Sequence, residues 1–594
     1  MDAKIYNQGI VMKKIIIGIN SHHSDSCACI LVDGKLIASV EEERFTRVKH
    51  WSGFPSTAIG YCLKEAGVSL SEVSAIAINQ DPKANILRKI YFALLKRPNI
   101  SMLISRALAK RAKSSIESDI KKYLGVGFAG TVHYEEHHMA HLSSAFHVSP
   151  FKESVLVSID GFGDFSSTAW GCGSGSDIQI AKRTYFPHSM GIFYMAITQF
   201  LGFSNWGDEY KVMGLSSYGE PAYLLELRKL IYLGSNGSFR LDLDYFQHHI
   251  VRLESLRPDG GPHVGNLYTK KLICLLGDPR KKDGPITQRE KDIAKSAQLI
   301  YEEVLFHILN AAYNRYKIPN LCIAGGCAMN SVANGKIKKN TPFKNIYIPP
   351  AAGDAGGAIG AAFNVWHKWY SSRSFEMNHA YWGPSFTDHC VADLISIRKA
   401  ELPESNYLIK KYNDRDLLNI DTARLIDIGS VVGWFQGRME LGPRALGNRS
   451  ILGDPRRADM QNILNIKIKR RESFRPFAPS ILRNYVKDWF EQEDDVPFMM
   501  QVFQIRNDKK NLIPAVTHVD GTGRLQTVTQ EENERYWGLI NAFHKLTGVP
   551  ILLNTSFNEN EPIVCTPEEA LNCFLRTKMD VLVMNNWLIL RRIT

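Results

Sequence analysis

One pattern of strand, polar loop and hairpin occurs twice in this chain, with the second copy about 140 residues after the first. Short apolar runs rich in β-branched residues mark the strands, and an Asp-Gly pair at 33–34 marks the first hairpin turn. The predicted strands are residues 14–18, 27–32, 36–40, 154–159, 167–172 and 178–183. This repeat predicts an internally duplicated α/β fold in which the two polar loops face each other across a cleft.

The remainder of the chain predicts a second α/β unit. A length of 594 residues suits two or more domains, and residues 369–407 combine mixed composition with two prolines. We therefore expect an N-terminal extension at 1–13, a duplicated domain at 14–395 and a second α/β domain at 406–594. Further strands are predicted at 320–323, 346–349, 549–553 and 581–583.

Composition disfavours several classes of protein. Ten cysteines are scattered without a CxxC pair, which fits a reduced cytoplasmic protein better than a disulfide framework. No apolar run approaches the roughly 20 residues of a membrane span, and the first dozen residues mix acids and bases, unlike a signal peptide. The net charge of +12 is compatible with acidic or phosphorylated partners. No nucleic-acid-binding module is recognisable, so we expect no nucleic-acid partner.

Residues 82–124 form a basic, helix-compatible stretch that is interrupted at Pro98. Lysines and arginines alternate there with Leu, Ile and Phe. The simpler interpretation is a pair of amphipathic surface helices with solvated charges. The alternative is a docking face for an anionic acceptor or a membrane surface.

Two histidines and two aspartates have the arrangement of a metal site. His137 and His141 are four residues apart in a helix-compatible segment, so both imidazoles lie on one helix face. Asp160 follows a predicted strand and Asp354 lies in a glycine-rich turn, and acids at strand ends of an α/β fold point into the ligand cleft. Two imidazoles and two carboxylates suit Fe(II), Mn(II) or Zn(II).

Three glycine-rich turns, at 161–163, 325–326 and 353–360, each follow an apolar strand. Glycine lets the backbone approach a phosphate closely, so three such turns in one domain favour nucleotide binding over plain turns. The candidate nucleotide-contacting residues are Gly161, Gly163, Gly325, Gly326, Asn330, Gly353 and Lys211.

Residues 437–479 gather ten lysines and arginines among glycines, prolines and apolar residues. Folded structure that collects guanidinium groups around glycine-rich turns commonly holds a phosphate-like anion. The candidate anion ligands are Arg444, Lys469 and Arg475, completed by Arg524 and Ser556. Arg456, Arg457 and Arg470 are interpreted as surface charge.

Ten ordered motifs resemble those of O-carbamoyltransferases of the nodulation and antibiotic-biosynthesis type. They are EEERFTRVKHW, HHMAH, SIDGFGD, DEYKVMGLSSYGEP, GGCAMNSVANGKI, GDAGGAIGAA, GRMELGPRALGNRSIL, KRRESFRPFAPS, HVDGTGRLQTV and LLNTSFN. The resemblance covers nearly the whole chain, from about residue 15 to residue 592. Members of this family place carbamoyl groups on hydroxyls of sugars or natural products.

The resemblance implies a fold and a two-step reaction. The N-terminal domain is similar to the actin/sugar-kinase ATPase fold, in the version of the tRNA threonylcarbamoyl-transfer protein. The C-terminal domain resembles the α/β carbamoyl-adenylate-forming (YrdC-like) partner in that pathway. Carbamoyl phosphate and ATP, with Mg²⁺ expected beside the ATP, would give carbamoyl-adenylate in the C-terminal pocket. The N-terminal metal site would then pass the carbamoyl group to an acceptor hydroxyl.

Residues carry over by motif. His137, His141, Asp160 and Asp354 match the family's metal ligands, with Fe²⁺ expected ahead of Mn²⁺ or Zn²⁺. Lys469, Arg475, Arg444, Arg524 and Ser556 match its pocket for carbamoyl phosphate and the adenylate. The chain departs from many relatives after its first strand, where Ser24-Asp25-Ser26 replaces a His-Asp-Ser triplet. A proton-transferring histidine in this loop would therefore be His23, one residue earlier.

Two rival functions remain at this point: a tRNA threonylcarbamoyl-type modification enzyme and a non-catalytic nucleotide-binding regulator. The fused arginine-rich half argues against the first, and the complete set of candidate site residues argues against the second. The expected partners are ATP, carbamoyl phosphate and a small-molecule hydroxyl acceptor. The sequence leaves the acceptor open between a lipopolysaccharide sugar, an oligosaccharide, an antibiotic and a toxin alcohol. It also leaves the oligomeric state open, a homodimer included.

Overall fold

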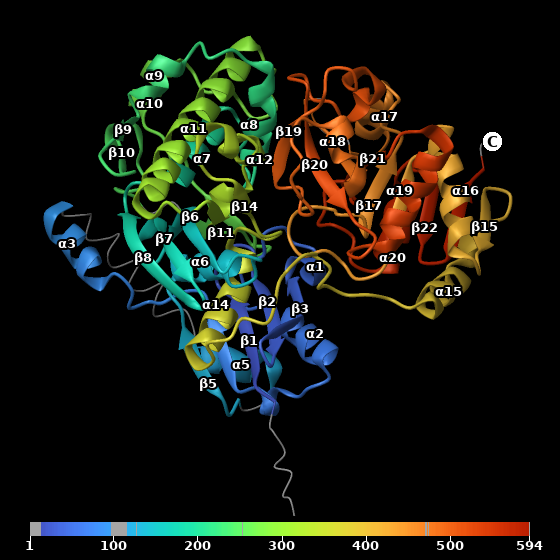
Figure 1. Cartoon of the computed structure of the whole chain (residues 1–594), viewed down its shortest axis with the longest axis horizontal. Helices are drawn as coiled ribbons and strands as arrows, with labels where there is room; N and C mark the ends of the chain where they lie inside the picture. Colours follow the sequence, from blue (N-terminus) through green and yellow to red (C-terminus); the bar gives the residue numbers. More distant parts are fainter. Residues whose placement is uncertain are drawn as a thin grey trace, which may run out of the picture.

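The computed structural model describes residues 13–96, 116–125, 128–251, 254–469, 472 and 474–592, which form an N-terminal and a C-terminal unit (Figure 1). The predicted extension at 1–13 lies outside the described residues except for Lys13. No helix in the described ranges is both long and apolar enough to span a bilayer.

The first sheet of the N-terminal unit has the strand order β3-β2-β1-β4-β5. Its strands are β1 (Ile15–Asn20), β2 (Cys27–Val32), β3 (Lys35–Glu41), β4 (Ala75–Ile78) and β5 (Thr131–Tyr134). The first three strands pair antiparallel, whereas β4 and β5 run parallel to β1. β1 is buried along its whole length, which explains its continuous apolar sequence.

The second sheet repeats this topology in the order β8-β7-β6-β13-β14. Its strands are β6 (Glu153–Gly163), β7 (Ser166–Ser174), β8 (Asp177–Tyr185), β13 (Asn320–Ala324) and β14 (Asn345–Tyr347). Again a three-stranded antiparallel meander is extended by two parallel strands. The matching strand orders confirm the predicted duplication and the actin/sugar-kinase-like fold of this unit.

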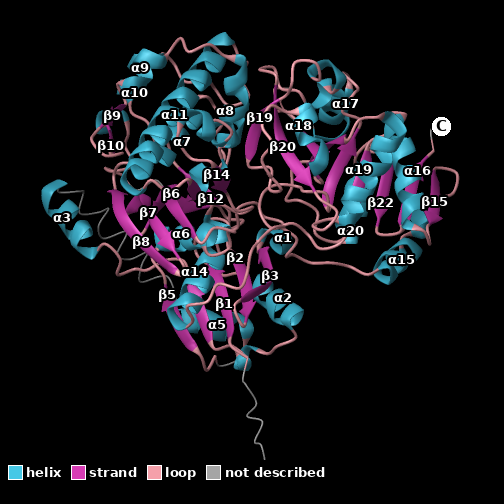
Figure 2. Ribbon diagram, in the orientation of Figure 1, coloured by secondary structure: helices cyan, strands magenta, loops and turns pink. Residues whose placement is uncertain are grey.

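Two helices pack against each other between the sheets (Figures 1 and 2). α6 (His137–Phe146) contacts β6 and β13, and α14 (Asp354–Trp369) contacts β1 and β2. A Cβ added at Gly360 of α14 would lie 1.8 Å from the carbonyl oxygen of Ala140 in α6. The prediction of a turn through 353–360 is wrong beyond Gly353, because the residues from Asp354 onward belong to α14, where Gly360 allows the close approach of α6.

Further helices cover the N-terminal unit, and two short hairpins extend it. The helices are α1 (Glu43–Thr46), α2 (Ser56–Ala66), α3 (Ile86–Lys96), α5 (Ile116–Leu124), α7 (Met190–Phe200), α8 (Glu209–Leu215), α9 (Leu224–Arg228), α10 (Lys270–Leu276), α11 (Gln288–Tyr316), α12 (Ser331–Asn334) and α13 (Ile337–Asn340). The hairpins are β9 (Ile231–Leu233) with β10 (Phe239–Leu241), and β11 (Glu254–Leu256) with β12 (Pro262–Val264). α3 and α5 belong to the predicted basic stretch, of which residues 97–115 lie outside the described residues.

The C-terminal unit is built on a nine-stranded mixed sheet in the order β15-β23-β22-β16-β17-β21-β18-β20-β19. Its strands are β15 (Tyr407–Lys411), β16 (Val432–Phe435), β17 (Arg449–Gly453), β18 (Ala478–Leu482), β19 (Gln501–Gln504), β20 (Thr522–Val528), β21 (Ile551–Ser556), β22 (Val581–Met584) and β23 (Trp587–Arg591). Its helices are α15 (Asp388–Ile397), α16 (Arg415–Asp427), α17 (Met460–Leu464), α18 (Val486–Trp489), α19 (Glu534–Thr547) and α20 (Pro567–Arg576). Val391 and Ile395 of α15 lie in the core of this unit. The C-terminal unit therefore includes residues that the sequence assigned to the end of the first domain, at 14–395.

Buried hydrogen bonds join the two units. Arg44 of α1 donates to the carbonyl oxygen of Gly442 at 2.9 Å, and the Gly442 amide donates to Glu41 at 2.7 Å. Arg47 donates to the carbonyl oxygen of Ile563 at 2.8 Å. Because these guanidinium groups are paired with carbonyls of the other unit, they fix how the two units face each other.

Candidate functional site

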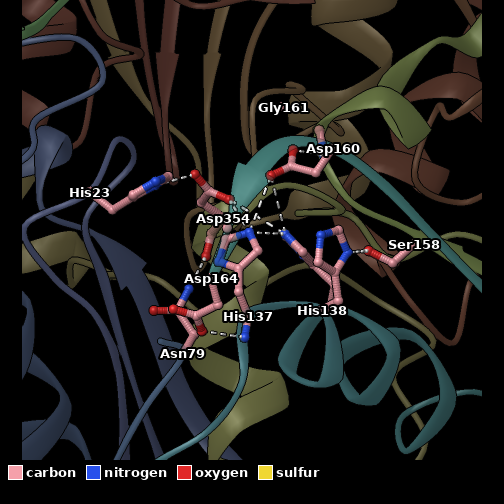
Figure 3. A network of polar contacts seen from close by, with 12 residues as sticks. His23, Asn79, His137, His138, Ser158, Asp160, Gly161, Asp164 and Asp354 are labelled. Atoms are coloured by element: carbon pink, nitrogen blue, oxygen red, sulfur yellow. Dashed lines mark hydrogen bonds and ion pairs between the residues drawn. The ribbon is translucent and has the colours of Figure 1, made fainter. Parts of the chain in front are cut away.

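Four side chains of the N-terminal unit converge on one point (Figure 3). The Nε2 atoms of His137 and His141, on successive turns of α6, lie 3.0 Å apart. Asp160, in the C-terminal part of β6, places Oδ2 3.2 Å from His137 Nε2. Asp354, the first residue of α14, places Oδ1 3.5 Å from both Nε2 atoms. Parallel strands and the two central helices thus bring together the four predicted residues.

Each carboxylate of this cluster has one oxygen held by the protein and the other turned to the imidazoles. Asp160 Oδ1 accepts a hydrogen bond from the Gly326 amide at 2.9 Å. Asp354 Oδ2 accepts one from Ser24 Oγ at 3.1 Å, and His23 Nδ1 lies 2.6 Å from it. Asp354 Oδ1 is buried, and its contacts with the two imidazole Nε2 atoms are long, at 3.5 Å. A buried carboxylate oxygen left in this way fits a cation as its partner.

Opposite charges perturb the titration of the cluster. Burial by itself lowers the pKa of His141, but hydrogen bonds and charge from Asp160 and Asp354 outweigh it and raise this pKa to about 9. The imidazoles in turn hold the pKa of Asp160 well below its usual range, against the effect of burial. His138 lies on the same helix but its Nδ1 lies 2.9 Å from Ser158 Oγ, and burial lowers its pKa to about 4. The His138 imidazole therefore bonds a serine hydroxyl rather than the two aspartates, and its pKa is lowered rather than raised.

The donor set passes a direct test of metal fit. The four ligand atoms lie within 4.8 Å of one another and all four residues are buried. Two imidazole nitrogens and two carboxylate oxygens are the ligands of Fe(II), Mn(II) and Zn(II) sites. A second group, Asp25, Glu43 and His50, also has ligand atoms within 4.8 Å of one another. Its members bond to one another, with His50 Nδ1 2.7 Å from Asp25 and the His50 amide donating to Glu43.

The structure places His23 beside the metal-candidate cluster, which is the position expected of a proton-transferring histidine from this loop. Its ring centre lies 5.7 Å from that of His137, and 35% of its side chain is exposed, against 11% or less for the four cluster residues. The role of His23 in proton transfer stays a prediction.

The prediction of a turn at 161–163 is wrong, because these residues continue strand β6, whereas Gly325 and Gly353 lie in loops at the edge of the same cluster. The Gly325 amide donates to the carbonyl oxygen of Ala352 at 2.7 Å, which ties two of the turns together. A Cβ at Gly163 would lie 2.0 Å from the His137 ring, so this glycine makes room for the imidazole. A Cβ at Gly161 would meet open space. Their contact with a nucleotide stays a prediction.

Two other predicted nucleotide contacts have different surroundings. The Asn330 side chain caps α12 through the Ala333 amide and exchanges hydrogen bonds with Gln298, so its polar atoms are occupied. Lys211 of α8 pairs with Asp208 at 3.1 Å and with Glu472 of the C-terminal unit at 3.4 Å. Lys211 therefore lies at the contact between the units rather than with the glycine turns.

Lys469 and Ser556 lie together in the C-terminal unit. The Lys469 ammonium donates to the carbonyl oxygen of Ser556 at 2.5 Å, and to the carbonyl and side-chain oxygens of Asn558 at 2.8 and 2.7 Å. It also lies 3.3 Å from Ser556 Oγ. The residue is only 2% exposed. Lys469 is thus a buried cation held by protein oxygens.

Arg444 and Arg475 both lie near Tyr210 of α8. The Arg475 guanidinium carbon is 4.6 Å from the centre of the Tyr210 ring, and its NH1 lies 3.8 Å from Glu472. Burial lowers the pKa of Arg444 to about 10, with Tyr210 opposing this shift. Arg444 Nε has no hydrogen-bond partner among the described residues. A desolvated guanidinium of this kind favours an anionic ligand.

Arg524 of β20 lines a cavity of about 250 Å³ between the units. Met213 and Gly214 of α8 line its N-terminal side, and Phe474 and His518 line its C-terminal side. α8 thus faces both this cavity and, through Tyr210, the Arg475 side chain. The five predicted anion ligands occupy three neighbourhoods, of which two adjoin α8.

The residues interpreted as surface charge pair with nearby acids. Arg456 bonds to Asp454 and Asp427, and Arg457 bonds to Asp459. Arg470 lies outside the described residues.

Three residues near the predicted sites were missed at the sequence level. Ser24 bonds Asp354, Tyr210 contacts Arg475, and His518 lines the Arg524 cavity. His518 Nδ1 lies 3.1 Å from Thr522 Oγ1, and Nε2 has no hydrogen-bond partner in the described part of the chain. His518 and Tyr210 both stand within the quoted motifs, which was the only signal available for them.

Known proteins with similar sequences span almost the whole chain. The uncharacterized protein sll1178 of Synechocystis sp. is 41% identical over 610 residues, covering 97% of this chain and 96% of the relative. The nodulation protein NolNO of Sinorhizobium fredii is 39% identical over 593 residues, covering 96% of this chain and 80% of the relative. The (R)-2-hydroxyglutaryl-CoA dehydratase component A of Acidaminococcus fermentans has a solved structure at 11% identity and a TM-score of 0.30, covering 60% of this chain and 98% of that one. This last likeness is too low to argue from.

Two family descriptions match the two units separately. The one described as carbamoyltransferase N-terminus covers residues 15–363, and the one described as carbamoyltransferase C-terminus covers residues 423–591. The first match alone spans more than half of the chain. The order and extent of both matches agree with the two units of the fold, and the chain belongs to the carbamoyltransferase family.

Proposed function

We propose that this carbamoyltransferase is ATP-dependent and transfers carbamoyl groups to an acceptor hydroxyl in two steps. In the first, carbamoyl phosphate, water and ATP react at the C-terminal unit: water releases phosphate from carbamoyl phosphate, and the resulting carbamate oxygen displaces pyrophosphate from ATP to give carbamoyl-adenylate. In the second, the acceptor oxygen bonds to the carbamoyl carbon and AMP leaves. One observation carries the proposal. A single chain places a His/Asp metal-candidate cluster in one unit and a set of buried and half-buried cations in the other, and the two units meet along α8.

The cations of the C-terminal unit suit the first step. Carbamoyl phosphate carries two negative charges, and the loss of its phosphate develops further charge on oxygen. Arg444 and Arg475 present guanidinium groups beside Tyr210, and Arg524 lines the adjoining cavity. Desolvated guanidinium groups bind phosphate oxygens more strongly than solvated ones, because the low dielectric strengthens the attraction.

The His/Asp cluster suits the second step. His137, His141, Asp160 and Asp354 would hold the metal, with Fe²⁺ proposed ahead of Mn²⁺ or Zn²⁺. A bound divalent ion supplies Lewis acidity toward a carbonyl or hydroxyl oxygen.

The surrounding residues orient this cluster and its substrate. Gly326 and Ser24 fix the outer carboxylate oxygens of Asp160 and Asp354. With Nδ1–H donated to Asp354, the Nε2 atom of the partly exposed His23 is left to accept the acceptor's proton. The open space at Gly161 leaves room for the nucleotide part of the adenylate.

The activation step is tested by pyrophosphate release from ATP and Mg²⁺, with and without carbamoyl phosphate, under anaerobic conditions with iron present. We expect release only in the presence of carbamoyl phosphate. Equal release in both samples, or none, would contradict ATP-dependent activation. Transfer is then followed with labelled carbamoyl phosphate and a panel of hydroxyl acceptors, and labelling of tRNA alone would assign the chain to the rival modification chemistry.

A further inference from the structure

Helix α3 exposes a continuous apolar stripe on the surface of the N-terminal unit. Five of its residues are each between 50% and 79% exposed: Ile86, Leu87, Ile90, Tyr91 and Leu94. Their spacing of three and four residues places them on one face of the helix. Single exposed apolar residues are common, but a stripe of five along one helix marks a surface that binds a partner.

The opposite face of α3 is anchored to the body of the molecule. The Phe92 ring lies 5.0 Å from Phe186 and 5.9 Å from Phe165, measured between ring centres. The Arg88 guanidinium carbon lies 4.8 Å from the centre of the Tyr185 ring at the end of β8. The helix is therefore oriented by its inner face, and it projects beyond the β-sheets at the side of the unit (Figure 1).

The segment that leads into α3 is tied to the metal-candidate cluster. The Asp81 amide donates to Asp164 Oδ2 at 2.7 Å, and Asn85 donates to the Asp164 carbonyl oxygen at 2.8 Å. The same Asp164 carboxylate accepts a hydrogen bond from the His137 amide at 2.9 Å. A partner seated on α3 is thus attached to the loop that follows Asp160.

Charge identifies the kind of partner. Over residues 82–96, which lead into and form α3, the sequence has four lysines and arginines and no acid. Lys83 and Arg88, which flank the stripe, are exposed. A surface that is both apolar and strongly basic matches an anionic bilayer, which offers hydrocarbon and negative headgroups together. Nucleic acid would satisfy the charges but not five exposed apolar side chains.

We propose that α3 docks the enzyme onto anionic phospholipid membranes, with the stripe of Ile86, Leu87, Ile90, Tyr91 and Leu94 in the headgroup region. Two other occupants fit less well. Residues 97–115 carry five cations and no acid, so their charge repels the basic surface around α3. A second copy of the chain would bring the same positive charge.

Co-sedimentation of the full chain with vesicles tests the proposal without ATP, carbamoyl phosphate or acceptor, so the outcome is independent of carbamoyl transfer. Vesicles of phosphatidylcholine alone are compared with vesicles that also contain phosphatidylglycerol. We expect at least about tenfold stronger partitioning onto the anionic vesicles, weakened by high salt. Protein that remains in the supernatant with both vesicles overturns the proposal.

Substitutions assign the binding to the stripe. The triple variant Leu87→Gln, Tyr91→Gln, Leu94→Gln keeps helix-compatible residues and should lose at least about tenfold in partitioning. Ile397→Gln is the matched control, because Ile397 of α15 is as exposed as Leu87, and it should partition as the unsubstituted protein does. If the triple variant melts early, Leu87→Gln alone should still lose about threefold.

Three results would contradict the assignment. A triple variant that partitions like the unsubstituted chain would show that α3 is not the contact. A molar mass in light scattering that doubles with concentration, and no longer does so in the triple variant, would assign the stripe to a second copy. Tight RNA binding that competes vesicles away and survives the triple substitution would assign the basic segment to nucleic acid.

Discussion

The four metal-candidate side chains lie within 4.8 Å of one another, whereas the five predicted anion ligands of the C-terminal unit fall into three neighbourhoods. In the first set, acids and imidazoles attract one another and are carried by α6, β6 and α14. In the second set, every charged member is a cation, so the charges repel one another, and Lys469 bonds the uncharged member Ser556. Each cation is therefore held by other protein groups or is left desolvated.

The comparison separates two ways of building a site. The His/Asp cluster is preorganised by elements whose positions are fixed by the duplicated sheets. We propose that the cation set is completed by its anion, because Arg444 Nε is buried without a hydrogen-bond partner among the described residues and a phosphate-like group would supply one. Substitutions in the first set should therefore remove a site that already exists, and those in the second should act mainly through the ligand.

The largest effect is expected from His141→Asn. Loss of one of four ligands should remove the metal, and transfer to the acceptor should fall on the order of 10³-fold, because a bound metal contributes several kcal/mol. Metal content by mass spectrometry and transfer of labelled carbamoyl are measured together. His138→Asn is the control, since His138 is buried on the same helix but bonds Ser158. Equal losses in both variants, or an equal fall in pyrophosphate release, would contradict the division of labour between the units.

Arg475→Ala should act on the other half of the reaction. A buried anion that loses a charge-assisted partner loses at least about 2 kcal/mol, so pyrophosphate release should fall by at least about 30-fold. Metal content should not change. Arg457→Ala is the control, because Arg457 is exposed and pairs with Asp459. A metal-deficient Arg475→Ala protein would show that the two sets are coupled rather than separate.

Lys469→Met should reduce stability as well as activation. The ammonium holds oxygens of Ser556 and Asn558 at 2.5–2.8 Å, and its removal leaves buried acceptors unpaired at a cost of about 1–3 kcal/mol. Urea unfolding measures this cost, and Lys487→Met on α18 provides a solvated comparison. Unchanged stability would mean that Lys469 is held for the ligand rather than by the protein.

Much of the first site could be predicted from the sequence, because its geometry follows from local rules. Histidines four apart lie on one helix face, and acids after buried strands face the cleft. Whether His23 reaches the cluster cannot be predicted in the same way, because it depends on the backbone of its loop. In that loop His22 and Asp25 both have positive φ angles, of 54° and 58°. His and Asp are enriched among non-glycine residues with positive φ, but composition and spacing do not say which residue of a loop adopts this conformation.

The second site was less predictable because it depends on how two units pack. Lys211 was grouped with the glycine turns, but α8 carries it to Glu472 of the other unit. The neighbours of Tyr210 and His518 also depend on how the units pack. Tyr210 contacts Arg475, more than 200 positions away in the sequence. His518 lines a cavity to which both units contribute. The sequence motifs identified which residues belong to the second site. Their positions relative to one another depend on tertiary packing, which the motifs do not encode.

The smallest effect is expected from His518→Gln, and it tests how the cavity meets its anion. Burial lowers the pKa of His518, the charge of Asp520 opposes this shift and the charge of Arg524 adds to it, and together they bring the pKa from 6.5 to about 4. The imidazole is therefore neutral near pH 7, with a buried Nε2 that has no hydrogen-bond partner among the described residues. A bound anion raises this pKa, so binding takes up a proton and becomes stronger as pH falls toward 6.5 and below.

Glutamine keeps a hydrogen-bonding side chain at this position but cannot gain the proton. The affinity of the unsubstituted protein for carbamoyl phosphate should therefore exceed that of His518→Gln by about threefold on the acidic side of neutrality and converge with it on the alkaline side. Calorimetry in buffers of different ionisation enthalpy measures the proton uptake directly. Because both proteins bind the same ligand, its own titration cancels in the comparison. Identical pH profiles would show that the anion binds away from His518. The cavity lined by Arg524 would then not be part of the anion site formed by Arg444 and Arg475.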